Sequence, residues 1–178
     1  NKKKINAGKV TTFSNYSIVS ENRLVKKPKA LNFRDSIFFG CAFPTGAGMV
    51  FNDIKVSKKD NIVIIGLGAV GLGTLLALNK YGVKNIIVID KDKKKHKLAK
   101  KLGIKHFFSS INHKTIKKIK NIFKNGADIC FESAGLAKTI EFGMKIVNEN
   151  GKLHFASHPD NKDFVRLRPH DLIKGKKI

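Results

Sequence analysis

The 178-residue sequence contains no tryptophan, only two cysteines and four prolines, and few acidic residues. Two cysteines are too few for a disulfide scaffold or for a cysteine-rich zinc finger. Only 13 acidic residues oppose 36 basic ones, and the net charge of +23 is typical of proteins that bind nucleic acids or anionic membranes. Almost all the basic residues are lysines, however, and they occur in every segment, which favours a compositional bias on solvated faces. We therefore expect neither a specific nucleic acid nor a membrane as a partner.

Long hydrophobic runs are also scarce. Residues 62–78 (IVIIGLGAVGLGTLLAL) approach the roughly 18 apolar residues of a membrane-spanning helix. Their centre is crowded with glycines, at Gly66, Gly68, Gly71 and Gly73, so a strand, a tight turn and a helix explain the stretch better. We expect a soluble, cytoplasmic protein. The first residue is asparagine and no signal peptide opens the sequence, so we also expect it to begin inside a longer protein.

After this stretch, short apolar runs alternate with amphipathic segments. The runs predict strands at residues 85–90, 106–109, 127–132 and 152–157, with helices at 91–102, around 116–123 and at 136–147. Strands that alternate with helices of this length need right-handed crossovers and form a parallel sheet. The sequence therefore predicts a doubly wound α/β domain, with a last, sixth strand that is truncated because it would begin only near residues 175–178.

The first 34 residues follow a different pattern. Residues 11–27 mix aromatic and β-branched side chains with turn residues, which predicts short antiparallel strands, and Pro28 marks a junction. Residues 35–52 are rich in phenylalanine and glycine and predict a helix beside the α/β domain. We therefore expect two regions: residues 1–34, the end of an earlier domain, and residues 35–178, the α/β domain.

The motif Gly66-Leu-Gly68-Ala-Val-Gly71 lies between the first predicted strand and a helix, and the next strand ends in Asp90. Gly66 permits a tight turn, Gly68 lets a pyrophosphate approach the backbone, and Gly71 lets the helix pack closely on the strand. The free N–H groups at the start of the helix favour phosphate. Asp90 can accept hydrogen bonds from ribose hydroxyls and would repel a 2′-phosphate. The pattern predicts a Rossmann-type NAD site; the alternative is a glycine turn without a ligand.

Taken together, these segments resemble the coenzyme-binding portion of zinc-dependent, medium-chain alcohol dehydrogenases. The resemblance rests on segments in family order, at residues 12–19, 39–46, 65–71, 88–90 with Lys95, 101–103, 126–128, 131–135 and 157–160. It implies a Rossmann-type doubly wound parallel sheet, preceded by short β segments from a truncated GroES-like domain. It also implies zinc-dependent transfer of hydride between an alcohol or polyol and NAD.

Residue roles follow from the resemblance, position by position. It implies coenzyme contacts for Thr45, Gly66, Gly68, Val70, Gly71, Asp90, Lys95, Ser133, Ala134 and Phe155. Thr45 and Val70 would lie against the nicotinamide, and Lys95 would reach the adenosine ribose. Cys41 would be one ligand of a catalytic zinc, whereas Cys130 is expected in the core.

The resemblance places the other zinc ligands and the proton relay before Asn1. We therefore expect no further catalytic residue in these 178 residues, and we expect them to be inactive alone. His158 follows the last predicted strand, where contact with substrate is an alternative. Two other functions stay open: a zinc-free quinone or enoyl reductase, and a non-catalytic module that binds NAD or nucleic acid.

Residues 163–168 (DFVRLR) resemble the edge strand through which family members pair into dimers. Arg166 and Arg168 would fall on one face, with Val165 and Leu167 buried on the other. The resemblance thus implies a homodimer through this strand, although a charge of +23 on each copy opposes association.

Overall fold

The computed structural model describes residues 12–178, and the chain divides into two compact units between Ile37 and Phe38. The described part of the first unit contains a 3-10 turn at Glu21–Arg23 and the short helix α1 (Phe33–Ser36). The side chain of Asn32 accepts a hydrogen bond from the backbone of Asp35 and so caps α1. The assignment of residues 1–34 to an earlier domain stays a prediction.

The short strands expected in residues 11–27 are not formed in residues 12–27, and residue 11 lies outside the described part. The aromatic and β-branched side chains of this segment are almost completely exposed, among them Phe13, Tyr16, Ile18 and Val25. A strand needs a hydrogen-bonded neighbour and a covered apolar face. Residues 12–37 provide no neighbouring strand, so the β-type composition of this segment does not lead to β structure there.

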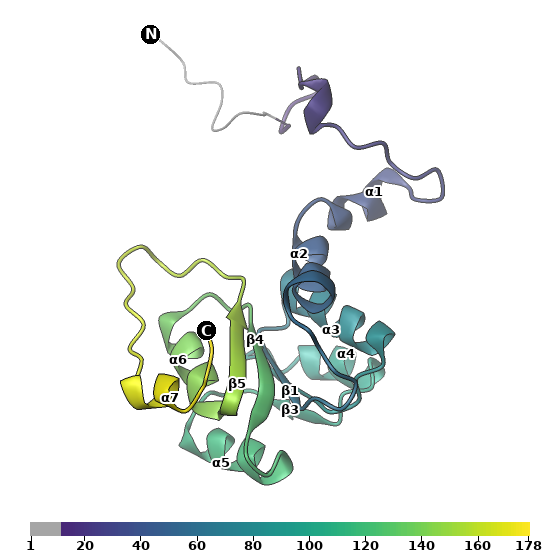
Figure 1. The fold of residues 1–178 in the computed structure, drawn as a ribbon. Coiled ribbons are helices and arrows are strands. Elements are labelled where there is room, and N and C mark those ends of the chain that lie inside the picture. The colour runs from purple at the N-terminus through teal and green to yellow at the C-terminus, as the bar shows by residue number, and fades with distance from the viewer. Residues whose placement is uncertain (1–11) are drawn as a thin grey trace. The chain divides into compact units, whose positions relative to one another are not determined.

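The second unit is built on a parallel sheet of five strands (Figure 1). The strands are β1 (Ile62–Ile65), β2 (Ile86–Ile89), β3 (His106–Phe108), β4 (Ala127–Glu132) and β5 (Val147–Phe155), in the order β3-β2-β1-β4-β5. All four residues of β1 and of β2 are buried, as their continuous β-branched runs predict. The expected doubly wound α/β fold is confirmed.

Helices cover both faces of this sheet (Figure 1). They are α3 (Ala69–Tyr81) and α4 (Lys95–Lys101) on one face, α5 (His113–Ile122) and α6 (Ala137–Ile146) on the other, and the short α7 (Pro169–Ile173) near the end of the chain. Leu75 and Leu78 of α3 enter one core, and Ile119 and Ile140 enter the other. Among residues 12–178, no helix is both long enough and apolar enough to cross a lipid bilayer.

The helix expected in residues 35–52 is present as α2 (Ala42–Gly48), which continues into a π-helical turn at Met49–Asp53. It packs against α3 at very short range. A Cβ atom on Gly46 would lie 2.1 Å from the carbonyl oxygen of Val70, and one on Gly73 would lie 2.8 Å from that of Phe43. The two helices can therefore cross only because glycine occupies both positions.

Strand β5 begins earlier than expected. Val147, expected in the preceding helix, pairs with Ala127, and Lys152 pairs with Ile129 two positions further along β4. The extra residues of β5 form an irregularity in which Asn150 takes a positive φ of 65°. Val147 is β-branched and lies beside Ala127, the first residue of β4, so the chain enters the sheet as soon as α6 ends at Ile146.

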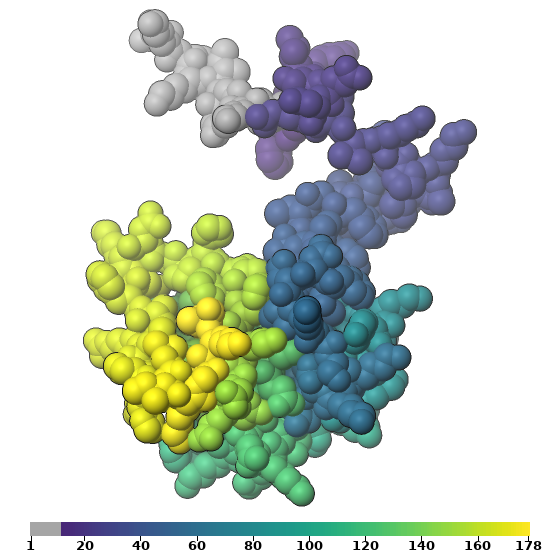
Figure 2. Space-filling view, in the orientation of Figure 1, coloured from purple at the N-terminus to yellow at the C-terminus, as the bar shows by residue number. Residues whose placement is uncertain are grey.

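Residues 163–168 form no strand, which corrects the expected edge strand. Their alternation is as expected, because Val165 and Leu167 are half-buried against the core while Arg166 is exposed. The free side of β5 is instead paired by Lys177, which forms a parallel bridge with Lys152. Figure 2 shows these last residues, in yellow, against the green part of the molecule. The expected sixth strand is represented by this bridge, and the homodimer stays a prediction.

Candidate functional site

The glycine motif forms the turn between β1 and α3. Gly66 has a φ of 90°, and a Cβ atom there would lie 2.9 Å from the backbone nitrogen of Ala134. A Cβ atom on Gly71 would lie only 1.9 Å from the carbonyl oxygen of Gly66. Gly68, at the start of α3, differs from both because nothing lies within 4 Å of its Cβ position. The turn is therefore closed on its protein side and open at Gly68, where a ligand can approach the free N–H groups.

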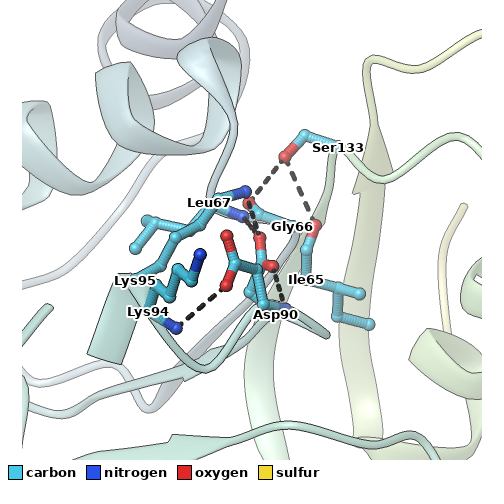
Figure 3. Close-up of polar contacts among 8 residues, drawn as sticks. Ile65, Gly66, Leu67, Asp90, Lys94, Lys95 and Ser133 are labelled. Atoms are coloured by element: carbon cyan, nitrogen blue, oxygen red, sulfur yellow. Dashed lines mark hydrogen bonds and ion pairs between the residues drawn. The ribbon is translucent and has the colours of Figure 1, made fainter. Parts of the chain in front are cut away.

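Asp90 directly follows β2, and its carboxylate lies beside this turn (Figure 3). Its Oδ2 accepts hydrogen bonds from the backbone nitrogen of Leu67 (2.7 Å) and from Nζ of Lys95 (2.9 Å), and its Oδ1 accepts one from the backbone nitrogen of Asp92 (2.8 Å). Burial opposes ionisation, but these donors outweigh it and hold the pKa of Asp90 below its ordinary value of 3.8. Asp90 is therefore a fixed carboxylate at neutral pH.

A cleft of about 400 Å³ opens at the carboxyl ends of the strands. Six residues singled out from the sequence line it: Gly66, Gly68, Asp90, Lys95, Ser133 and Ala134. Gly71 lies directly beneath it, against Gly66. The chain order reverses between β1 and β4, and ligands of open α/β sheets bind at such a switch point.

Three other predicted residues, Thr45, Val70 and Phe155, do not line this cleft. The hydroxyl of Thr45 donates to the carbonyl oxygen of Cys41 (2.9 Å), and the crossing of α2 with α3 places the backbone next to Thr45 against that of Val70. Phe155 is 42% exposed at the end of β5. Thr45 and Val70 thus share one helix crossing, and contact of all three with a coenzyme stays a prediction.

Several residues of the cleft were missed from the sequence. Ser109, Ser110 and Ile111 follow β3, while Leu136, Lys138 and Thr139 belong to the start of α6. Their position directly after the carboxyl ends of predicted strands was the available signal. Glu132 was missed as well: it ends β4, it is completely buried, and its carboxylate accepts hydrogen bonds from the loop that follows.

The two cysteines lie in different surroundings: Cys130 lies in the core, as expected, while zinc ligation by Cys41 stays a prediction. Cys130 is fully buried, and burial together with the nearby Glu132 carboxylate raises the pKa of its thiol. Cys41 is exposed. Within residues 12–178, no group of three His, Cys, Asp or Glu side chains is arranged to hold a metal ion. The described residues therefore do not form a zinc site by themselves.

A second cleft, of about 600 Å³, is larger but lies among α5, the start of β5 and α7, away from the glycine turn. Its acidic residues are already used within the protein. Glu149 pairs with Lys174 at 2.7 Å, and Asp171 pairs with Lys176 at 3.0 Å. We assign the candidate site to the smaller cleft because the open backbone at Gly68 and the carboxylate of Asp90 converge there, at the switch point of the sheet.

Comparisons with known proteins identify the family to which the chain belongs. The family described as "Zinc-binding dehydrogenase" matches residues 69–178. An S-(hydroxymethyl)glutathione dehydrogenase of Paracoccus denitrificans is 28% identical over 93% of this chain and 46% of its own length. A "CYP enzymes assisting alcohol dehydrogenase" of Catharanthus roseus is 32% identical over 76% of this chain and 37% of its own length. The chain thus spans about half the length, or less, of the curated relatives it matches.

The solved structure of benzyl alcohol dehydrogenase from Acinetobacter calcoaceticus has the same fold, with a TM-score of 0.87. It is 31% identical, over 94% of this chain and 47% of that one. The resemblance to zinc-type alcohol dehydrogenases is therefore confirmed by sequence and by structure. This chain belongs to the zinc-binding dehydrogenase family.

Proposed function

We propose that the chain is the coenzyme-binding part of an NAD-dependent alcohol dehydrogenase that transfers hydride between a small alcohol or polyol and NAD. The family match supports an oxidoreductase, and the relatives include alcohol dehydrogenases. The observation that carries the coenzyme assignment is the carboxylate of Asp90 at the end of β2, beside the open backbone of Gly68.

The hydrogen bonds of Asp90 favour NAD over NADP. A carboxylate has about four lone-pair sites, and three protein donors use three of them. One site is left for a hydroxyl of the adenosine ribose. A 2′-phosphate would instead bring two or so negative charges against a carboxylate that is only 8% exposed. Lys95, and Lys91 at the rim of the cleft, would reduce this repulsion without removing it.

The other residues of the cleft fit a dinucleotide. The start of α3 at Gly68 offers free N–H groups to the pyrophosphate, and Ser133 and Ala134 border the opposite wall. When bound, the nicotinamide supplies the carbon that accepts or donates hydride. In this proposal Thr45, Val70 and Phe155 exclude water from the nicotinamide, and the cleft residues orient it.

Zinc ligation by Cys41 is part of the same proposal, and it concerns the complete protein. Cys41 is exposed and so is free to complete a site with ligands supplied from elsewhere. In the complete protein, Cys41→Ser is expected to reduce zinc content and turnover while leaving NADH affinity within about twofold. Unchanged zinc content would contradict the assignment of Cys41.

The coenzyme assignment is tested by titrating this chain with NADH and NADPH and following nicotinamide fluorescence. We expect NADH to bind at least tenfold more tightly. Asp90→Ala should narrow that preference by about tenfold, which corresponds to about 1.4 kcal/mol. Asp163→Ala, which removes an exposed carboxylate outside the cleft, is the matched control and should not change the ratio. The proposal is wrong if NADPH binds as tightly as NADH to the unmodified chain.

The same samples can be supplied with NAD⁺ and an alcohol. Because the chain spans about half the length of its relatives, we expect no alcohol-dependent reduction of NAD⁺ by these residues alone. Turnover by the 178 residues would show that the whole active site is contained in them.

A further inference from the structure

Glu132 is a fully buried carboxylate at the carboxyl end of a central strand. It is the last residue of β4 and lies opposite Ile65 of β1 and Phe155 of β5, and its exposure is 0%. Transfer of a carboxylate from water to such a place is strongly unfavourable unless hydrogen bonds replace its hydration. The contacts of Glu132 therefore show what keeps it there.

Four hydrogen-bond donors surround Glu132. Its Oε1 accepts from the backbone nitrogens of Ala134 (2.8 Å) and Gly135 (3.0 Å). The hydroxyl of Thr139 shares its one hydrogen between this Oε1 (2.8 Å) and the carbonyl oxygen of Leu136 (2.6 Å). The Oε2 of Glu132 accepts from the hydroxyl of Ser157. One side chain thus joins the loop after β4, the first turn of α6 and the segment after β5.

Two of these segments form a wall of the candidate coenzyme cleft, to which Ala134 and Thr139 both belong. The loop also touches the glycine turn. A Cβ atom on Gly66 would lie 2.9 Å from the backbone nitrogen of Ala134, and the hydroxyl of Ser133 donates to the carbonyl oxygen of Gly66 (2.9 Å). A shift of the loop would therefore move both the cleft wall and the turn that starts α3.

We propose that Glu132 is a positioning residue for the coenzyme, which holds the loop of residues 133–136 and the segment at Ser157 in place through the hydrogen bonds that it accepts. It does not contact the coenzyme, because its oxygens already face protein donors and water cannot reach it. This inference rests on the proposed coenzyme function and adds to it the residue that fixes the shape of the cleft wall.

Variants of Glu132 separate positioning from simple stability. Glu132→Gln keeps an oxygen for the amides of Ala134 and Gly135 and offers its NH₂ group to the hydroxyl of Ser157. Glu132→Leu has a similar volume but leaves the donors without an acceptor. The control is Ile119→Val, since Ile119 of α5 is fully buried but does not line the cleft.

The measurement is the dissociation constant of NADH for the folded chain, alongside its thermal midpoint. We expect Glu132→Leu to weaken binding at least tenfold, Ser157→Ala to weaken it about threefold, and Glu132→Gln to restore affinity to within about threefold of the unmodified chain. Ile119→Val should lower the thermal midpoint without changing NADH affinity. If Glu132→Leu binds NADH within twofold of the unmodified chain, the proposal is overturned; if that variant does not fold, unchanged affinity in Ser157→Ala overturns it.

Amide hydrogen exchange at Ala134 and Gly135 tests the proposal without any coenzyme. Both amides should be protected in the unmodified chain and in Glu132→Gln, and they should exchange at least a hundredfold faster in Glu132→Leu. If the chain does not bind NADH but shows this pattern, the coenzyme function fails and the positioning of the loop stands. Equal exchange in Glu132→Leu and the unmodified chain would overturn the positioning role itself.

Discussion

Two carboxylates lie at the same edge of the sheet, one on each side of β1. Asp90 follows β2 and Glu132 ends β4, and these strands are the two neighbours of β1. The register places Ile65, the last residue of β1, opposite both Ile89 and Glu132. The two acids therefore flank the glycine turn at similar depth, and their surroundings explain why we assign them different tasks.

The surroundings differ in charge and in access. Asp90 is 8% exposed and pairs with the ammonium group of Lys95. Glu132 is 0% exposed and has only neutral donors around it, with no ion pair to any residue among 12–178. A carboxylate that keeps an accessible lone pair can bind a ligand, whereas one whose oxygens are all enclosed can act only on the protein around it. Free acceptor capacity, and not the residue type, therefore distinguishes a binding acid from a positioning acid.

The largest expected effect is on stability. Glu132→Ala removes the acceptor of the Ala134 and Gly135 amides and of the Ser157 hydroxyl, and it should lower the free energy of unfolding by about 3 kcal/mol. Asp90→Ala should lower it by only about 1–2 kcal/mol, because water from the cleft can solvate the groups that it releases. Urea unfolding of both variants measures the difference. Equal losses of unfolding free energy would show that Asp90 is as enclosed as Glu132.

Asp90 could be predicted from the sequence, but Glu132 could not. The glycine spacing and the acid at the end of the next strand form a pattern with a known physical task, and that pattern is local in the sequence. A glutamate at the end of an apolar run is equally compatible with an exposed strand end. Its burial depends on β1 and β5 on its two sides and on Ser157, which lies 25 positions away. Such a long-range arrangement leaves no periodic signal.

The same distinction explains how well the fold was predicted. Continuous apolar runs such as residues 62–65 and 86–89 predicted the buried strands because their burial follows from their own composition. The strands expected at 11–27 and 163–168 failed in the described residues, since alternation shows only which side chains share a face. Whether such a segment pairs depends on a neighbouring strand, and at the free side of β5 that neighbour is Lys177.

Lowering the pH should have a smaller effect on the free energy of unfolding. The hydrogen bonds that Asp90 accepts lower its pKa in the folded state, so ionised Asp90 stabilises the fold at pH values above the unfolded-state pKa of about 3.8. That stabilisation is lost as the pH falls through the lower, folded-state pKa. Between pH 5 and pH 2, the unmodified chain should therefore lose more unfolding free energy than Asp90→Asn does. Asp163→Asn is the exposed control. If the unmodified chain and Asp90→Asn lose the same unfolding free energy, the donors around Asp90 do not favour its ionised form.

The smallest effect concerns the two thiols, which report on the open and the enclosed parts of the second unit. Cys41 is exposed, whereas Cys130 is buried two positions before Glu132, and its raised thiol pKa keeps it protonated. In the native chain, a thiol reagent such as dithionitrobenzoate should react quickly with one cysteine and with the second only after unfolding. Cys41→Ser should abolish the fast reaction and change the unfolding free energy by less than about 0.5 kcal/mol.

The slow reaction of Cys130 also separates the two carboxylates. Asp90→Ala should leave it nearly unchanged, while Glu132→Ala should accelerate it because the enclosing loop is released. Two fast thiols in the unmodified chain would show that β4 is open to solvent and that Glu132 is not enclosed.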